Sequence, residues 1–177
     1  FFAIGFATTT PPTAHAEQAA AREGLSNFTV CAPHGPTPAA VEAILGGEDA
    51  AAGRVKVDAV IGPGHVSLIT GGDYYRPIVE AHGLPIVIAG FEPVDVLEAA
   101  LMAIRQLNAG RAAVEIQYVR AVTQEGNRLA QAAMEDVFAL RDSFDWRGLG
   151  SIEQSALELA PKYHAFDAER RFAAPYR

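Results

Sequence analysis

The stretch "LPIVIAGFEPVDVLEAALMAIRQL", residues 84–107, indicates the fold class of this 177-residue chain. Residues 84–89 form a continuous apolar run, which is typical of a strand buried on both faces of a parallel sheet. Glu92 and Pro93 follow at a helix start, where proline loses no hydrogen bond because its missing N–H would have been unpaired. Apolar residues then recur along one face of the expected helix: Val94, Leu97, Leu101 and Ile104.

The same order of apolar run and helix occurs earlier in the chain, with runs at residues 1–6, 27–32 and 57–64. Thr-Pro pairs open two of the expected helices, and a threonine hydroxyl can cap the free N–H groups of a helix. Alternating buried strands and helices are typical of a parallel sheet with helices on both sides. The sequence therefore predicts an α/β fold: a parallel sheet of about four to five strands, flanked by helices on both faces, with a C-terminal extension.

The second half continues this pattern less regularly. Residues 114–122 are a candidate fifth strand, and residues 152–159 are a candidate later one. Residues 127–140 predict a helix whose core-facing positions recur at helical spacing: Leu129, Ala133, Val137 and Leu140. We expect an α/β lobe over 1–145 and an extension over 146–177.

Charge and composition exclude several classes of function. The net charge is −7 without a basic cluster, which argues against binding to nucleic acid. No apolar stretch reaches the roughly 20 residues that span a bilayer. The single cysteine, Cys31, excludes a disulfide within the chain and a site of four cysteines. Because the chain begins at Phe1, inside a strand-like run, we expect it to be part of a longer protein.

Polar residues follow the predicted strands at their carboxyl ends, where open parallel sheets bind ligands. These residues are Thr8 and Thr9, then His34, then His65 and Ser67, then Glu92. His65 and Glu92 form a candidate acid–base pair of a small-molecule enzyme if they approach within hydrogen-bond reach. The alternative is that His65 caps or packs a helix. Cys31 and His34 have the spacing of half a metal site, but no second pair follows.

The loops together resemble a known family in matching order. The segments that carry the resemblance are "FFAIGFATTTPPTA", "GPGHVS", "IAGFEPVDVLEAALMAIRQLNAGRAAVE", "YVRAVTQEGNRLAQAAMEDVF", "WRGLG" and "AFDAERRF". They are similar to the HypD family of hydrogenase maturation factors, from Phe1 to about Phe172. The resemblance implies a cytoplasmic assembly scaffold that helps build the Fe(CN)2CO centre of [NiFe]-hydrogenase, with HypC-type and HypE-type partner proteins.

The resemblance also implies two similar α/β lobes that face one cleft, together with an iron–sulfur domain. Iron and a [4Fe–4S] cluster belong to the full-length family, and the cysteine motifs that hold them do not occur in this sequence. We therefore expect no metal bound by this chain alone. Ala7 stands where the family usually has glutamate, so the cleft lacks that carboxylate. The cleft-lining positions carried over are Gly5, Phe6, Thr8, Thr9, His34, Gly64, His65, Val66, Ser67, Gly90, Phe91, Glu92 and Pro93.

Overall fold

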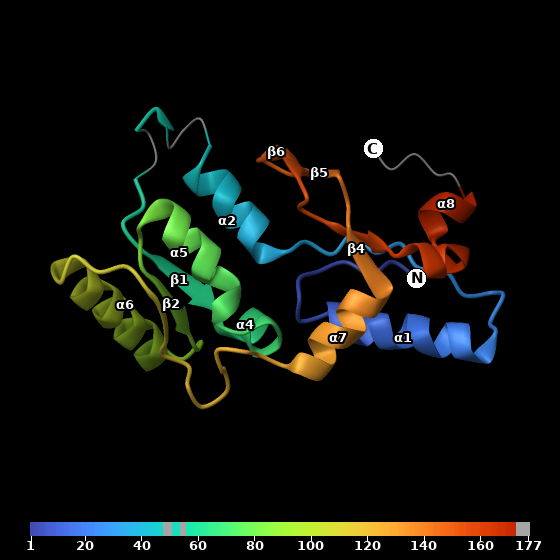
Figure 1. Cartoon of the computed structure of the whole chain (residues 1–177), viewed down its shortest axis with the longest axis horizontal. Coiled ribbons are helices and arrows are strands. Elements are labelled where there is room, and N and C mark those ends of the chain that lie inside the picture. Colours follow the sequence, from blue (N-terminus) through green and yellow to red (C-terminus); the bar gives the residue numbers. More distant parts are fainter. Residues whose placement is uncertain (48–50, 54–55, 173–177) are drawn as a thin grey trace. The chain divides into compact units, whose positions relative to one another are not determined.

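The computed structural model describes residues 1–47, 51–53 and 56–172 (Figure 1). The chain forms two compact units. We call Ala40–Arg128 the sheet unit, and Phe1–Ala39 with Leu129–Arg177 the terminal unit. The predicted α/β class is confirmed, whereas the predicted lobe over 1–145 and extension over 146–177 stay a prediction. None of the described helices is long and apolar enough to cross a membrane.

The sheet unit contains a parallel sheet of three strands in the order β1–β2–β3. In the central strand, β2, Ile86 pairs with Val60 of β1 on one side and with Val114 of β3 on the other. Helix α2 (Thr37–Leu45) spans the boundary of the two units. The elements that follow it are β1 (Val60–Pro63), α4 (Gly64–Thr70), η1 (Asp73–Tyr75), α5 (Arg76–His82), β2 (Ile86–Ala89), α6 (Pro93–Asn108) and β3 (Val114–Ile116). The expected strand within 114–122 is thus present and shorter than predicted.

Helices cover both faces of this sheet, as predicted (Figure 1). Successive side chains of a strand point to opposite faces. Ile86 and Ile88 pack with Ile78 of α5, whereas Val87 packs with Ala99 of α6. The three β2 residues Ile86, Val87 and Ile88 are fully buried, which explains the continuous apolar run in the sequence.

The predicted strand count was too high. The runs at 1–6 and 27–32 lie in the terminal unit and are joined there by single parallel bridges, Phe2 to Cys31 and Gly5 to His34. Pro33 and Pro36 lack the N–H that a sheet ladder needs, so the pairing does not extend as a regular strand.

The apolar face predicted for α6 is exposed to solvent. Val94 and Leu97 are 72% and 71% exposed. The residues that α6 buries are Asp95, Ala99, Ala103 and Gln106. Two alanines in this set allow the helix axis to approach the sheet closely, and the larger apolar side chains then point away from it.

The terminal unit is built from short elements around a core that includes Val30, Val137 and Phe166. Its elements are α1 (Thr10–Glu23), α7 (Arg128–Val137), β4 (Phe138–Leu140), β5 (Ser143–Trp146), β6 (Gly150–Glu153), β7 (Leu157–Leu159), η2 (Pro161–Phe166) and α8 (Ala168–Phe172). Strands β4 and β7 pair antiparallel, as do β5 and β6.

Two predictions for this part need correction. The helix predicted over 127–140 ends at Val137, because the chain becomes extended and pairs as β4. Ala133 and Val137 are buried as expected, but Leu129 and Leu140 are 85% and 51% exposed. The strand predicted over 152–159 is split into β6 and β7, with Gln154 between them at a positive φ of 48°.

Candidate functional site

The first turn of α4, which follows β1 directly, is shaped by a close backbone approach at Gly64. A Cβ atom at this position would lie 2.4 Å from the carbonyl oxygen of Ala89 and 2.8 Å from Cδ1 of Tyr118. Only glycine fits there without displacing its neighbours. Val66 and Ser67 are buried, and the Ser67 hydroxyl donates to the carbonyl of Pro63 at 2.8 Å. These two predicted site residues therefore support the turn from inside, and His65 is its exposed member.

The loop that follows β2 lies beside it, because Pro63 at the end of β1 is in register with Ala89 at the end of β2. The His65 imidazole stacks on the Phe91 ring, with ring centroids 4.1 Å apart and an angle of 33° between the planes. Phe91 is 59% exposed. The structure thus brings together the start of α4 and the loop after β2, two segments that the sequence placed at the carboxyl ends of neighbouring strands.

Glu92 is engaged by an arginine that the sequence did not single out. Its carboxylate accepts a hydrogen bond from Arg120 at 2.5 Å. Within the described residues, no hydrogen bond joins Glu92 to His65. The structure therefore does not assemble the acid–base pair that the sequence suggested, and it assigns Glu92 to an ion pair.

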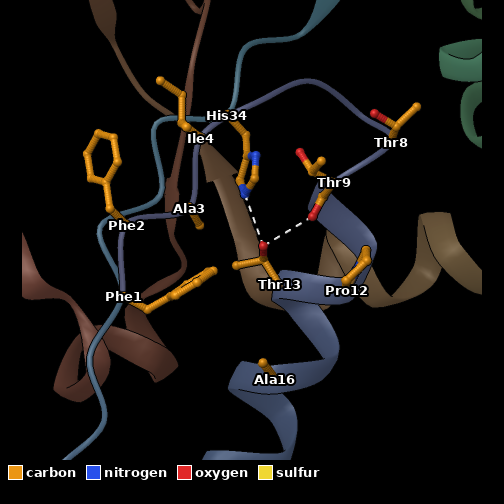
Figure 2. Close-up of a pocket in the computed structure, with 10 residues that line it drawn as sticks. All are labelled: Phe1, Phe2, Ala3, Ile4, Thr8, Thr9, Pro12, Thr13, Ala16 and His34. Carbon is orange, nitrogen blue, oxygen red and sulfur yellow. Dashed lines mark hydrogen bonds between the residues drawn. The ribbon is translucent and has the colours of Figure 1, made fainter.

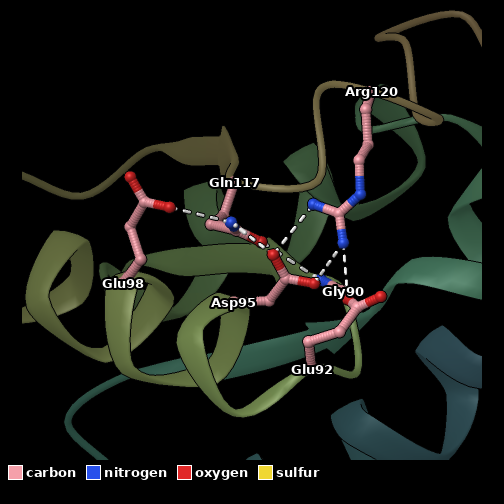
Figure 3. A network of polar contacts seen from close by, with 6 residues as sticks. All are labelled: Gly90, Glu92, Asp95, Glu98, Gln117 and Arg120. Atoms are coloured by element: carbon pink, nitrogen blue, oxygen red, sulfur yellow. Dashed lines mark hydrogen bonds and ion pairs between the residues drawn. The ribbon is translucent and has the colours of Figure 1, made fainter.

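Arg120 belongs to a polar network at the base of the Gly90–Pro93 loop (Figure 3). Its guanidinium donates to both carboxylate oxygens of Asp95, at 2.8 and 2.5 Å. These hydrogen bonds hold the pKa of Asp95 well below its usual range, and the same contact raises the pKa of Arg120. Gln117 donates to Asp95 at 3.0 Å and accepts from the N–H of Gly90 at 3.2 Å. The loop is therefore tied to the segment that follows β3.

Sequence reasoning missed this network. Its hydrogen bonds join residues 19 to 28 positions apart in the chain, as the pairs Gln117–Glu98 and Arg120–Glu92 show. The segment "YVRAVTQEGN" carried part of the family resemblance, but nothing in its composition pointed to a role for Arg120. Only the register of β2 against β3 brings these side chains together.

The other predicted site residues lie in the terminal unit, where Thr8, Thr9 and His34 line a pocket of about 380 Å³ (Figure 2). Gly5 has a positive φ of 148°, and a Cβ there would lie 2.3 Å from Oγ1 of Thr9. The Thr9 hydroxyl donates to the carbonyl of Phe6 at 3.0 Å. Thr8 and Thr9 line the pocket with apolar side chains from the start of the chain: Phe1, Phe2, Ala3 and Ile4.

His34 closes one side of this pocket and is 1% exposed. Its Nε2 lies 3.3 Å from the hydroxyl of Thr13, which itself donates to the carbonyl of Thr9 at 3.1 Å. The Thr13 oxygen is therefore free to accept a hydrogen bond from the His34 ring. Burial lowers the pKa of His34, which favours the neutral ring.

The residues with metal-binding chemistry do not converge. Cys31 donates to Glu169 at a sulfur–oxygen distance of 3.4 Å, while His34 contacts Thr13. In the part of the chain that the structure describes, no group of three or more His, Cys, Asp or Glu side chains is placed to hold a metal ion.

The predicted site residues thus form two sets, each within its own unit. One set contains Gly5, Phe6, Thr8, Thr9 and His34, and the other contains Gly64, His65, Val66, Ser67, Gly90, Phe91, Glu92 and Pro93. That both sets line one cleft stays a prediction. Ala7, at the position where the resemblance implies a glutamate, is 6% exposed.

Comparison with known proteins gives the family. The family model HypD, described as "Hydrogenase formation hypA family", matches residues 1–177. The chain is 56% identical over 173 residues to the hydrogenase expression/formation protein HupD of Azotobacter chroococcum mcd 1, covering 98% of this chain and 46% of that protein. It is 54% identical over 177 residues to the hydrogenase maturation factor HypD of Azotobacter vinelandii, covering 100% and 47%.

A more distant relative shows the same extent of similarity. The chain is 41% identical over 172 residues to the hydrogenase maturation factor HypD of Escherichia coli K12, covering 97% of this chain and 45% of that protein. The chain spans about half the length of the curated relatives it matches. The chain therefore belongs to the HypD family of hydrogenase maturation factors.

Proposed function

We propose that this chain forms part of a hydrogenase maturation scaffold, which helps assemble the Fe(CN)2CO centre of [NiFe]-hydrogenase with HypC-type and HypE-type partner proteins. Family membership over the whole chain supports the role in maturation. In this account the iron complex is the cargo of the assembly. The chain contributes loops that contact a partner or the cargo.

The observation that carries this proposal is the stacked pair of His65 and Phe91. Both rings are exposed; His65 lies in the first turn of α4 and Phe91 in the loop after β2, and close backbone packing at Gly64 and Gly90 holds the two segments. An exposed aromatic surface on a rigid base suits recognition of another molecule. Glu92 is paired with Arg120 rather than with His65, so the geometry favours contact over proton transfer.

Iron chemistry requires residues beyond those of this chain. A [4Fe–4S] cluster is held by cysteine thiolates, and the sequence has one cysteine. Cys31 is 5% exposed and donates to Glu169. The residues present therefore do not fit a resident cluster, and we assign no iron ligand to this chain. In the scaffold that we propose, the thiolates belong to other segments of the longer protein.

Hydrogenase maturation in cells tests the proposal. The full-length gene that carries this chain is expressed in a strain without its own HypD, and the activity of a [NiFe]-hydrogenase is measured. Phe91→Ala and His65→Ala are expected to lower the yield of active hydrogenase by about tenfold or more, the effect of losing one central contact of an interface. The amount of soluble HypD protein, measured by immunoblot, should stay unchanged.

His15→Ala is the matched control, because His15 is an exposed histidine on α1 and lies outside the proposed surface. It should leave the hydrogenase yield at the level of the unsubstituted protein. If Phe91→Ala and His65→Ala both retain full hydrogenase activity, the proposed role of this surface is wrong.

A further inference from the structure

We propose that Arg120 is a positioning residue for the His65–Phe91 surface: its guanidinium holds the Gly90–Pro93 loop in the conformation that stacks Phe91 on His65. This inference rests on the proposed function only in that the surface is taken to contact a partner or the cargo. The contacts themselves lie within the sheet unit and are independent of any partner.

Arg120 contacts three groups at once. It donates to Glu92 in the loop and to Asp95 in the first turn of α6, each at 2.5 Å through the same Nη2 atom. Its guanidinium carbon lies 4.4 Å from the centre of the Tyr118 ring. A planar guanidinium can bridge two carboxylates and stack on a ring together, whereas a lysine ammonium offers only a point charge.

Tyr118 extends this contact to the start of α4 as well as to the loop. A Cβ at Gly64 would lie 2.8 Å from Cδ1 of Tyr118, and a Cβ at Gly90 would lie 2.8 Å from Cδ2 of the same ring. The two edges of one ring therefore pack against the backbone of α4 at Gly64 and that of the loop at Gly90. Because Arg120 covers the face of this ring, the position of Arg120 is coupled to both segments.

The segment that carries Arg120 is itself fixed to the sheet. The backbone N–H groups of Gln117 and Tyr118 both donate to the carbonyl of Ile88, at 2.9 and 3.1 Å. The Gln117 side chain donates to Asp95 and to Glu98, and its oxygen accepts from the N–H of Gly90 (Figure 3). Arg120 thus acts from a rigid base on Glu92, the exposed loop residue that follows Phe91 in the chain.

The exposure of these side chains indicates that the Arg120–Glu92 pair positions the loop and contributes little to the stability of the fold. The side chains of Arg120 and Glu92 are 49% and 65% exposed, and an ion pair at such exposure contributes little to folding. Asp95 is 5% exposed, so it needs a positive neighbour. Arg120→Lys keeps that charge but removes the planar guanidinium, which bridges the two carboxylates and stacks on Tyr118. This substitution should release the loop and keep the unit folded.

NMR detects the stacking of His65 on Phe91 directly. The 177-residue chain is prepared with ¹³C-labelled histidine, and the ring signals of His65 are followed by NMR, since the Phe91 ring shifts them. Phe91→Leu defines the position of the unstacked signal. Arg120→Lys is expected to move the His65 signals in that same direction, with unchanged signals from His82 and His15.

Arg111→Lys is the matched control, because Arg111 also pairs with a glutamate of the sheet unit, Glu115 at 2.5 Å, away from the loops. It should leave His65 unchanged. If His65 keeps its position in Arg120→Lys, the positioning role is overturned.

A second variant applies if Arg120→Lys disturbs the fold, as a shifted His82 signal would reveal. Glu92→Ala leaves the Arg120–Asp95 pair intact and removes the carboxylate that links Arg120 to the loop. It too should shift His65, and an unshifted His65 in this variant refutes the proposal. Shifted His65 signals together with full hydrogenase maturation would keep the positioning role and reject the proposed function of the surface.

Discussion

Glu17 of α1 gives a quantitative test of the terminal unit. Its side chain is fully buried, and neither carboxylate oxygen has a hydrogen-bond partner among the described residues. Burial, together with the nearby Asp167 carboxylate, raises the pKa of Glu17 from its ordinary value of 4.5 to about 7, and the ammonium group of Phe1 opposes this rise. Folding therefore favours the protonated form of Glu17.

The sign of the effect follows from the two pKa values. Below pH 4.5 Glu17 is protonated in both states, and it brings no charge penalty. Between pH 4.5 and about 7 the unfolded chain releases the proton that the folded chain retains, so the free energy of unfolding falls as the pH rises. At 1.36 kcal/mol per pH unit this interval amounts to about 3 kcal/mol, reached near pH 7.

Glu17→Gln removes the titration with little change in shape. Urea unfolding, followed by circular dichroism between pH 4.5 and 7, should show a stability gain of the variant that grows with pH toward about 3 kcal/mol. Glu23→Gln is the control, because Glu23 lies on the same helix and is exposed. If the two stability curves of Glu17→Gln and the unsubstituted chain stay parallel over this range, the reasoning on Glu17 is refuted.

Three further predictions concern packing and the buried histidine. Leu97→Gln should change the free energy of unfolding by less than about 0.5 kcal/mol, because Leu97 is 71% exposed. Ala99→Leu, at a fully buried site, should lower the free energy of unfolding by about 1–3 kcal/mol. Urea unfolding measures both changes, and equal effects would contradict the orientation of α6. Gly90→Ala should lower stability by about 1–3 kcal/mol, since its Cβ would lie 2.0 Å from Oδ2 of Asp95, and an unchanged melting temperature would rule out this packing. Burial lowers the pKa of His34, so the fold is most stable above pH 6.5, where the ring is neutral, and it loses stability on acidification. His34→Gln should remove that loss. The free energy of unfolding, measured for the variant and the unsubstituted chain from pH 7 to 5, checks this.

The core of the sheet unit is predictable from the sequence because its signals are local. A continuous apolar run indicated β2, and Glu92 with Pro93 marked the start of α6. The neighbouring loops at the strand ends followed from the general geometry of parallel sheets. His65 and Phe91 meet for that reason, although their stacking depends on side-chain detail that no pattern contains.

The features that the sequence did not predict depend on contacts distant in the chain. The large apolar residues of α6 suggested its inner face, but alanines such as Ala99 pack on the sheet and leave Leu97 outside. Apolar runs near Phe2 and Val30 suggested strands of the main sheet, yet their partners lie in the terminal unit. Arg120 reaches Glu92 across 28 positions, which only the folded register reveals.

The most direct test of the central claim is an infrared spectrum of the full-length protein that carries this chain, purified together with the HypC-type protein that we propose as its partner, from cells that make a [NiFe]-hydrogenase. The account predicts stretching bands of iron-bound cyanide and carbonyl on the complex, weakened by Phe91→Ala and retained in His15→Ala. A soluble complex without these bands, from cells that produce active hydrogenase, would contradict the proposed role in assembling the Fe(CN)2CO centre.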